Sequence, residues 1–152
     1  MTIAAAYRVD QNGAPFMGEV KVSVHVENAY DREFADRGLW NPDRVKTAIV
    51  EMVVDTGSTL PVLPEHIVAQ LGLRRLYQTP AKLADGTVRN VWIASGAQFR
   101  FLSRICIVDC VVGPSEMPAL LGQIPLEEMD LLVDCRQQTL IVASTDGPRI
   151  RI

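Results

Sequence analysis

The part of this sequence with the clearest chemistry is an acid at the end of an apolar segment. Residues 48–54 are rich in β-branched side chains, which predicts a strand. The strand leads into Asp55-Thr56-Gly57-Ser58, where the glycine permits a tight turn and the hydroxyls can donate hydrogen bonds to a carboxylate. We expect the Ser58 hydroxyl to donate to the outer oxygen of Asp55. The motif could hold one carboxylate in a fixed position for acid–base chemistry. An ordinary strand followed by an Asp/Gly/Ser turn would have the same sequence.

Composition and charge narrow the class of protein. The chain has 152 residues, enough for one domain, with 48% hydrophobic and 22% charged residues, as is typical of a globular protein. A net charge of −3 gives no reason to expect nucleic acid or an anionic membrane as a partner. There is no apolar run of about 18 residues and no secretory signal pattern, so we expect a cytoplasmic protein without a membrane partner.

Three cysteines and two histidines make a poor set of metal ligands. Cys106 and Cys110 lie four residues apart in an expected strand, and Cys135 is distant in sequence. We expect all three to be buried free thiols, with no metal ion and no cofactor.

Around the acid, local patterns predict mostly strands. Residues 1–17 form a weakly patterned arm, and 18–152 the domain. Valines alternate with polar residues over 19–27, which predicts a half-buried strand. Residues 28–44 are polar and predict a long loop. Within it, Leu39 and Trp40 could cap the core, which we favour, or line a binding cleft.

After the acid, two short helices and two hairpins are expected. Pro64 suits a first helical position and Gly72 a helix stop, so a helix is predicted between them. The sequence Ala84-Asp85-Gly86-Thr87 predicts a hairpin turn. Further expected elements are strands at 98–101 and 105–112, an apolar run ending in Leu120-Leu121-Gly122, a helix at 124–129, a hairpin at 131–142 and an edge strand in the last ten residues.

Taken in this order, residues 18–143 resemble the retropepsin-like aspartic proteases, small dimeric relatives of pepsin. The resemblance rests on the valine-rich strand before Asp55-Thr56-Gly57-Ser58, the later Leu120-Leu121-Gly122 followed by a helix, and the hairpin between them. It implies an all-β, retropepsin-like closed barrel with one or two short helices, in a small single-DTG member of bacterial or archaeal type. Many retroviral members carry an ion pair at the places held here by Thr59 and Gln123, so the dimer and its cleft must be braced in some other way.

The implied activity is that of an aspartic endopeptidase. Such hydrolysis needs two carboxylates that share one proton across a water molecule, and the chain has one DTG motif, so a homodimer must supply the second acid. Asp134 is the other candidate acid, but its turn context favours a structural role.

The resemblance assigns roles by position. Asp55 would be the acid or base, Thr56 would link the two active-site loops, and Gly57 would contact a peptide or protein substrate through its backbone. The expected substrate-binding residues are Ser58, Thr59 and a flap made of Leu83, Ala84, Asp85, Gly86 and Thr87. The alternative is a dimeric peptide- or protein-binding module that does not cleave. A purely structural β-domain would not explain why the acid, hydroxyl and glycine occur together with the second motif.

Overall fold

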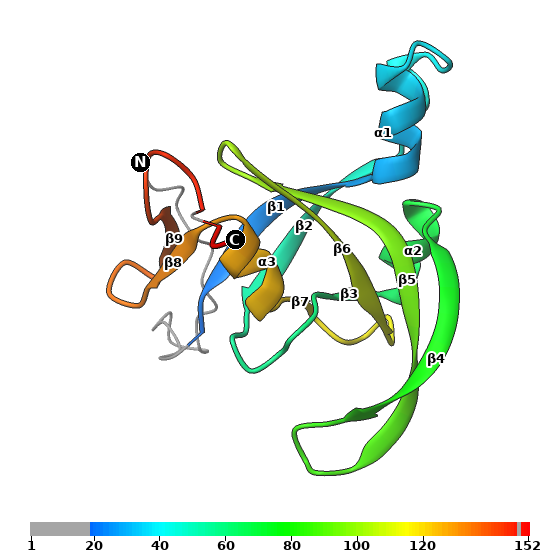
Figure 1. Cartoon of the computed structure of the whole chain (residues 1–152). Coiled ribbons are helices and arrows are strands. Elements are labelled where there is room, and N and C mark those ends of the chain that lie inside the picture. The colour runs from blue at the N-terminus through cyan, green and yellow to red at the C-terminus, as the bar shows by residue number, and fades with distance from the viewer. Residues whose placement is uncertain (1–18, 149) are drawn as a thin grey trace, which may run out of the picture.

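The computed structural model describes residues 19–148 and 150–152, so the whole of the expected N-terminal arm, 1–17, lies outside the described residues. Six strands form a closed barrel, since β1 pairs with β5 as well as with β2. Around the barrel their order is β1 (Lys21–Asn28), β2 (Thr47–Val54), β7 (Ala119–Leu121), β3 (Val62–Pro64), β6 (Arg104–Gly113) and β5 (Val88–Phe101) (Figure 1). The predicted all-β closed barrel is therefore confirmed.

The remaining elements extend or cover this barrel. Strand β4 (Arg74–Lys82) pairs with β5 and makes a long hairpin. Strands β8 (Leu131–Asp134) and β9 (Thr139–Val142) form a separate two-stranded sheet, as predicted. The helices are α1 (Ala29–Asp36), α2 (Glu65–Gln70) and α3 (Gln123–Glu128), with a 3-10 turn at Pro42–Arg44.

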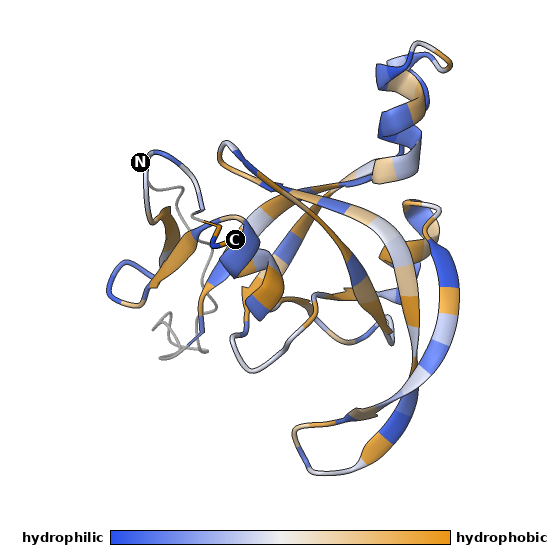
Figure 2. Ribbon diagram, in the orientation of Figure 1, coloured by the Kyte–Doolittle hydropathy of each residue, from blue (hydrophilic) through white to orange (hydrophobic). Residues whose placement is uncertain are grey.

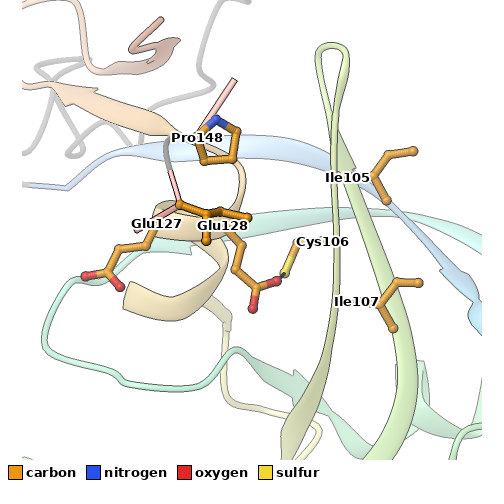
Figure 3. Close-up of a pocket in the computed structure, with 7 residues that line it drawn as sticks. Ile105, Cys106, Ile107, Glu127, Glu128 and Pro148 are labelled. Atoms are coloured by element: carbon orange, nitrogen blue, oxygen red, sulfur yellow. Dashed lines mark hydrogen bonds between the residues drawn. The ribbon is translucent and has the colours of Figure 1, made fainter. Parts of the chain in front are cut away.

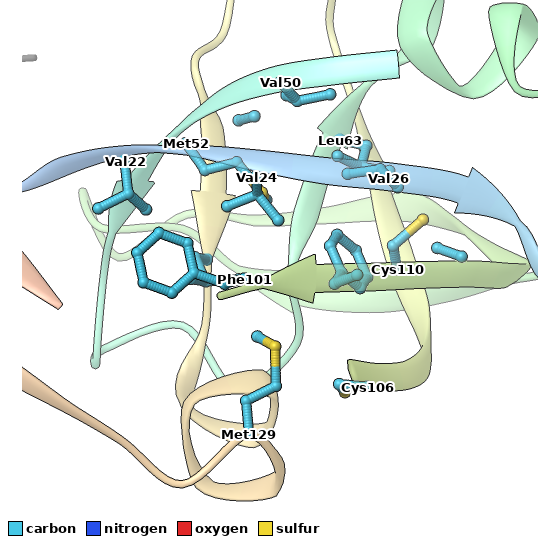
Figure 4. Packing of buried hydrophobic residues seen from close by; sticks show 14 of the residues in the cluster. Val22, Val24, Val26, Val50, Met52, Leu63, Phe101, Cys106, Cys110 and Met129 are labelled. Atoms are coloured by element: carbon cyan, nitrogen blue, oxygen red, sulfur yellow. The ribbon is translucent and has the colours of Figure 1, made fainter. Parts of the chain in front are cut away.

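The core fills the barrel because the strands alternate. Val22, Val24 and Val26 of β1 are 1%, 0% and 0% exposed, and in Figure 4 they pack near Met52 of β2 and Phe101 of β5. Burying one such side chain contributes about 1.5–3 kcal/mol. The alternation that predicts β1 from sequence is thus the pattern that fills the core. Figure 2 shows the same alternation as hydrophilic and hydrophobic bands along the long β4–β5 hairpin.

The predicted loop at 28–44 is wrong, because most of it forms α1 and the 3-10 turn. The side chain of Asn28 accepts hydrogen bonds from the backbone N–H groups of Tyr30 and Asp31, which caps the helix. Glu27, only 1% exposed, accepts from Arg32 at 2.9 Å and from Gln98 at 2.9 Å. These polar side chains are therefore fixed by partners and are not solvated loop residues.

Three smaller expectations are also corrected. Leu39 is 66% exposed and Trp40 packs on Phe34 with 5.3 Å between ring centroids, so neither caps the core. Cys106 and Cys110 are buried as predicted, but Cys135 is exposed. No strand follows β9 in the described part of 143–152, so the expected edge strand is wrong.

Helix α2 begins at Glu65, with Pro64 as its N-cap, and the positive φ of 62° at Gly72 ends the turn as expected. None of the helices in the described ranges is long and apolar enough to span a membrane.

Candidate active site

Asp55 lies immediately after β2, at the start of the loop that leads to β3. Its backbone N–H donates to the carbonyl of Leu121 at 3.0 Å, so pairing with β7 continues one residue past the strand. The N–H of Gly57 donates to Oδ1 of Asp55 at 2.9 Å. The carboxylate is thus held by a backbone donor while its side chain stays half-buried. Thr56, beside it, is exposed.

The expected contact between Ser58 and the Asp55 carboxylate is wrong. The Ser58 hydroxyl donates to the carbonyl of Leu60 at 2.7 Å, within the same loop. The Ser58 N–H donates to the backbone carbonyl of Asp55 at 3.1 Å, which closes the turn. The hydroxyl therefore stabilises the loop backbone, and the direct donor to the carboxylate is the Gly57 N–H.

Strand β7 passes between the two ends of this loop, parallel to β2 and antiparallel to β3. Beyond it, the N–H of Gln123 donates to the Ser58 carbonyl at 2.7 Å, and the N–H of Ile124 donates to the Thr59 carbonyl at 3.1 Å. A Cβ at Gly122 would lie 2.6 Å from the carbonyl oxygens of both Ser58 and Leu60. Only glycine allows this approach, so the Leu120-Leu121-Gly122 motif clamps the loop.

The register of the strands places a row of side chains on one face of the sheet. Strand partners point to the same side of a sheet. The pairs are Val53 with Leu120, Leu120 with Val62, Val62 with Val111, Val111 with Ile93, and Ile93 with Tyr77. Their neighbours Met52, Leu121, Leu63 and Val112 lie in the core, so the row faces the opposite way. We call this side the Asp55 face, because Asp55 is two residues after Val53 and alternation puts its side chain there.

This face is sheltered although it points away from the barrel core. Ile93 is 2% and Val62 is 7% exposed. The row connects the candidate acid to the base of the β4–β5 hairpin. Sequence reasoning missed these residues except through the motif that contains Leu120, since no local signal joins Val53, Val62 and Ile93.

The predicted flap residues form the turn of the β4–β5 hairpin. Leu83 donates to the Thr87 carbonyl at 2.8 Å, and Gly86 has a φ of 85°, as the predicted turn requires. Oδ1 of Asp85 accepts from the hydroxyl of Thr87 at 2.6 Å and from its N–H at 2.9 Å. These bonds hold the pKa of Asp85 below its ordinary value, and the positive charge of Arg89 adds to the effect.

In Figure 1 this hairpin extends beyond the barrel, on the same side of the view as the loop joining β2 to β3. No hydrogen bond between the turn and the Asp55 loop occurs in the described residues. The two parts of the predicted site are connected through the Asp55 face.

Other candidate groups have structural partners. Asp134 accepts from the N–H groups of Arg136 and Gln137, both at 3.0 Å, which supports the structural role predicted for it. Among residues 19–148 and 150–152, no cluster of three or more His, Cys, Asp or Glu side chains could hold a metal ion.

A cavity of about 610 Å³ lies elsewhere on the barrel (Figure 3). Ile105, Ile107 and Glu127 line it together with Cys106, whose thiol donates to Glu128 at 3.0 Å. Burial raises the pKa of the Cys106 thiol, and the carboxylate of Glu128 raises it further. This thiol is therefore a poor nucleophile. Burial likewise raises the pKa of Cys110, to about 12.

A second cavity of about 260 Å³ adjoins the active-site loop, where Thr56 and Val54 line it opposite Val133 and Cys135. The loop thus borders open space between itself and the β8–β9 hairpin.

No family model and no curated protein sequence matches this chain. Its structure is similar to a retropepsin-like aspartic protease from Rickettsia conorii, with a TM-score of 0.51 and 15% identity over 92% of this chain and 88% of that one. It is also similar to the retroviral protease-like domain of Ddi1 from Leishmania major, with a TM-score of 0.50 and 11% identity over 87% and 95% of the two chains. At these identities the likeness concerns the fold: the chain adopts the retropepsin-like fold.

Proposed function

We propose that this chain is an aspartic endopeptidase that works as a homodimer. The observation that carries the proposal is the position of Asp55, whose carboxylate accepts from the Gly57 N–H in a loop clamped by β7. The retropepsin-like fold supports the same reading. A fixed, half-buried carboxylate on a sheltered face is suited to acid–base chemistry.

The chemistry needs two such carboxylates. Two acids a few ångströms apart cannot both ionise, so one Asp55 keeps a proton and the other is charged. The charged carboxylate takes a proton from the bound water, whose oxygen attacks the peptide carbonyl carbon. The protonated carboxyl donates a hydrogen bond to the carbonyl oxygen. Proton transfer to the peptide nitrogen then allows the C–N bond to break.

The second carboxylate is supplied by the same residue of a partner chain. A two-fold axis beside the loop places identical residues opposite each other, which the symmetry of the reaction requires. Thr56 is exposed on this loop and can contact the partner loop through its hydroxyl. The substrate lies as an extended peptide along the Asp55 face, beneath the Leu83–Thr87 turn, with the carbonyl of Gly57 near its backbone, since the Gly57 N–H donates to Asp55.

The test is digestion of a peptide library by the wild-type chain and by Asp55→Asn. We expect the variant to lose at least about 10³-fold in kcat/KM, because the amide keeps the shape but cannot exchange the proton. The thermal unfolding temperature and the sedimentation coefficient should stay close to the wild-type values. Cleavage by the variant at the wild-type rate would overturn the proposal.

A non-cleaving peptide-binding module is the second candidate, and the absence of a charged pair at Thr59 and Gln123 favours it. Cleavage and binding of the same peptide library distinguish the endopeptidase from the binding module. If the wild type cleaves nothing but retains peptides with unchanged affinity in Asp55→Asn, the binding module is the better reading.

A further inference from the structure

The β4–β5 hairpin is a basic element in an acidic protein. Between residues 74 and 92 there are four basic residues and one acid, which give a charge of +3, whereas the whole chain carries −3. The basic residues are Arg74, Arg75, Lys82 and Arg89. The one acid, Asp85, is occupied within the turn, where its Oδ1 accepts two hydrogen bonds from Thr87. The hairpin therefore presents positive charge to whatever lies beside it.

The register divides this charge between the two sides of the hairpin. Arg89 pairs with Ala81, Val91 with Thr79, and Ile93 with Tyr77, so all six share the Asp55 face. Lys82 pairs with Val88 on the opposite side.

Exposure distinguishes the two sides in the middle of the hairpin, although Tyr77 on the Asp55 face is 54% exposed. Thr79, Ala81 and Val91 are half-buried, whereas their neighbours Gln78, Pro80, Lys82, Val88 and Asn90 are exposed. On the Asp55 face the half-buried row reaches Ala81 and Val91, and Arg89 follows it as an exposed cation next to the turn. Arg74, which pairs with Ser95, is the cation at the other end of the hairpin on the same face.

Arg89 has room beside it, and it acts on Asp85 through charge alone, since the hydrogen bonds to Asp85 in the described residues come from Thr87. Its strand partner is the small Ala81, which leaves space beside the guanidinium. Arg89 makes no ion pair within the part of the chain that the structure describes, unlike Arg75, which lies 3.9 Å from Glu65. A guanidinium presents a planar fork of N–H donors that fits a carboxylate in two parallel hydrogen bonds.

We propose that Arg89 is a specificity-determining residue that binds an acidic side chain of the peptide substrate, because it lies on the Asp55 face next to the turn and makes no ion pair in the described residues. This inference rests on the proposed endopeptidase function. An acidic residue in the peptide replaces water around Arg89 when the hairpin lies over the substrate. Its carboxylate then meets the guanidinium while the peptide backbone runs along the Asp55 face.

The experiment uses pairs of quenched fluorescent peptides that differ by Glu or Gln at one position, scanned over three residues on each side of a cleaved bond. At one position we expect the wild type to cleave the Glu peptide with about tenfold higher kcat/KM, the effect of about 1.4 kcal/mol in binding. Arg89→Gln should reduce this preference to about twofold or less, mainly by lowering kcat/KM for the Glu peptide. Arg89→Glu should prefer a Lys peptide at that position.

Lys82→Gln is the matched control. It removes the same charge from the same hairpin but from the opposite face, and so should keep the preference for Glu. If Lys82→Gln and Arg89→Gln lose the preference equally, the effect is only the net charge of the hairpin and the assignment to Arg89 is wrong. If no position shows a preference for Glu, the inference is also wrong.

A binding measurement separates this inference from the proposed function. Fluorescence anisotropy with the same peptide sequences, labelled with one fluorophore and no quencher, and Asp55→Asn protein should show tighter binding of the Glu peptide. This preference should be lost when Arg89→Gln is added to Asp55→Asn. If the Glu peptide binds more tightly through Arg89 but the wild type cleaves no peptide, Arg89 is a recognition residue and the endopeptidase proposal is overturned. Cleavage with equal affinity for both peptides would support the endopeptidase and overturn the role of Arg89.

Discussion

The backbone N–H of Gln123 lies 2.7 Å from the carbonyl oxygen of Ser58 and donates a hydrogen bond to it. With the bond from Ile124 to Thr59 at 3.1 Å, it joins the start of α3 to the active-site loop. Each bond involves one of the two positions, Gln123 and Thr59, that hold an ion pair in many retroviral relatives. Backbone hydrogen bonds brace this loop instead, and they depend on how closely Gly122 approaches it.

Gly122→Ala should therefore damage the loop. A Cβ placed 2.6 Å from the oxygens of Ser58 and Leu60 cannot be accommodated without moving the backbone. We expect a loss of about 2 kcal/mol or more in the free energy of unfolding, measured by urea denaturation, together with loss of peptide cleavage. Gly86→Ala is the matched control, because a Cβ at that position would meet no atom within 4 Å. Its positive φ should cost only about 1–2 kcal/mol, and equal costs for the two variants would contradict the clamp.

Ser58→Ala should lower stability without changing the pH dependence of catalysis. The hydroxyl donates to the Leu60 carbonyl, and losing this bond costs about 0.5–1.5 kcal/mol. Because the hydroxyl makes its hydrogen bond to Leu60 and not to the Asp55 carboxyl group, the acid limb of the pH–rate profile should stay in place. Ser58→Thr should restore most of the stability. A shift of the acid limb to higher pH in Ser58→Ala would mean that the hydroxyl stabilises the charged dyad in the working enzyme.

Activity should depend on association of two chains. Each chain contributes one Asp55, so specific activity should fall on dilution as dimers separate. Mixing wild type with an equal amount of Asp55→Asn should reduce wild-type activity to about half after subunit exchange, since half of the wild-type chains then pair with an inactive one. An active species that sediments as a monomer would exclude this mechanism.

The turn at 83–88 should become ordered when a substrate-like inhibitor binds. Its side chains are exposed, and few apolar contacts hold it against the rest of the barrel. Hydrogen exchange of its amides, measured by mass spectrometry, should slow in the complex. Helix α1 at the other end of the molecule in Figure 1 serves as the internal control. Equal exchange in the turn with and without the inhibitor would count against a closing flap.

Local patterns in the sequence determined most strands, the two hairpins and the loop that carries Asp55. Alternation predicts β1 because each inward valine fills the barrel, and Asp85-Gly86 predicts its turn because Gly86 adopts a positive φ. Such features depend on residues within a few positions of one another, so they can be read from the chain. Helix α1 was missed although its cap at Asn28 is local, because the polar composition of residues 28–44 favours a loop. The bond between Glu27 and Gln98, 71 positions later, could not be read from the chain.

The tertiary structure alone decided how the candidate site is arranged. Val53, Leu120, Val62 and Ile93 share the Asp55 face only through the register of strands that are distant in sequence. From the sequence, the Ser58 hydroxyl could donate to either Asp55 or Leu60. The path of the loop around β7 places the Leu60 carbonyl where it accepts this hydrogen bond. Register and loop path are set by packing across the whole barrel, because a shift of one residue would turn every buried side chain outward.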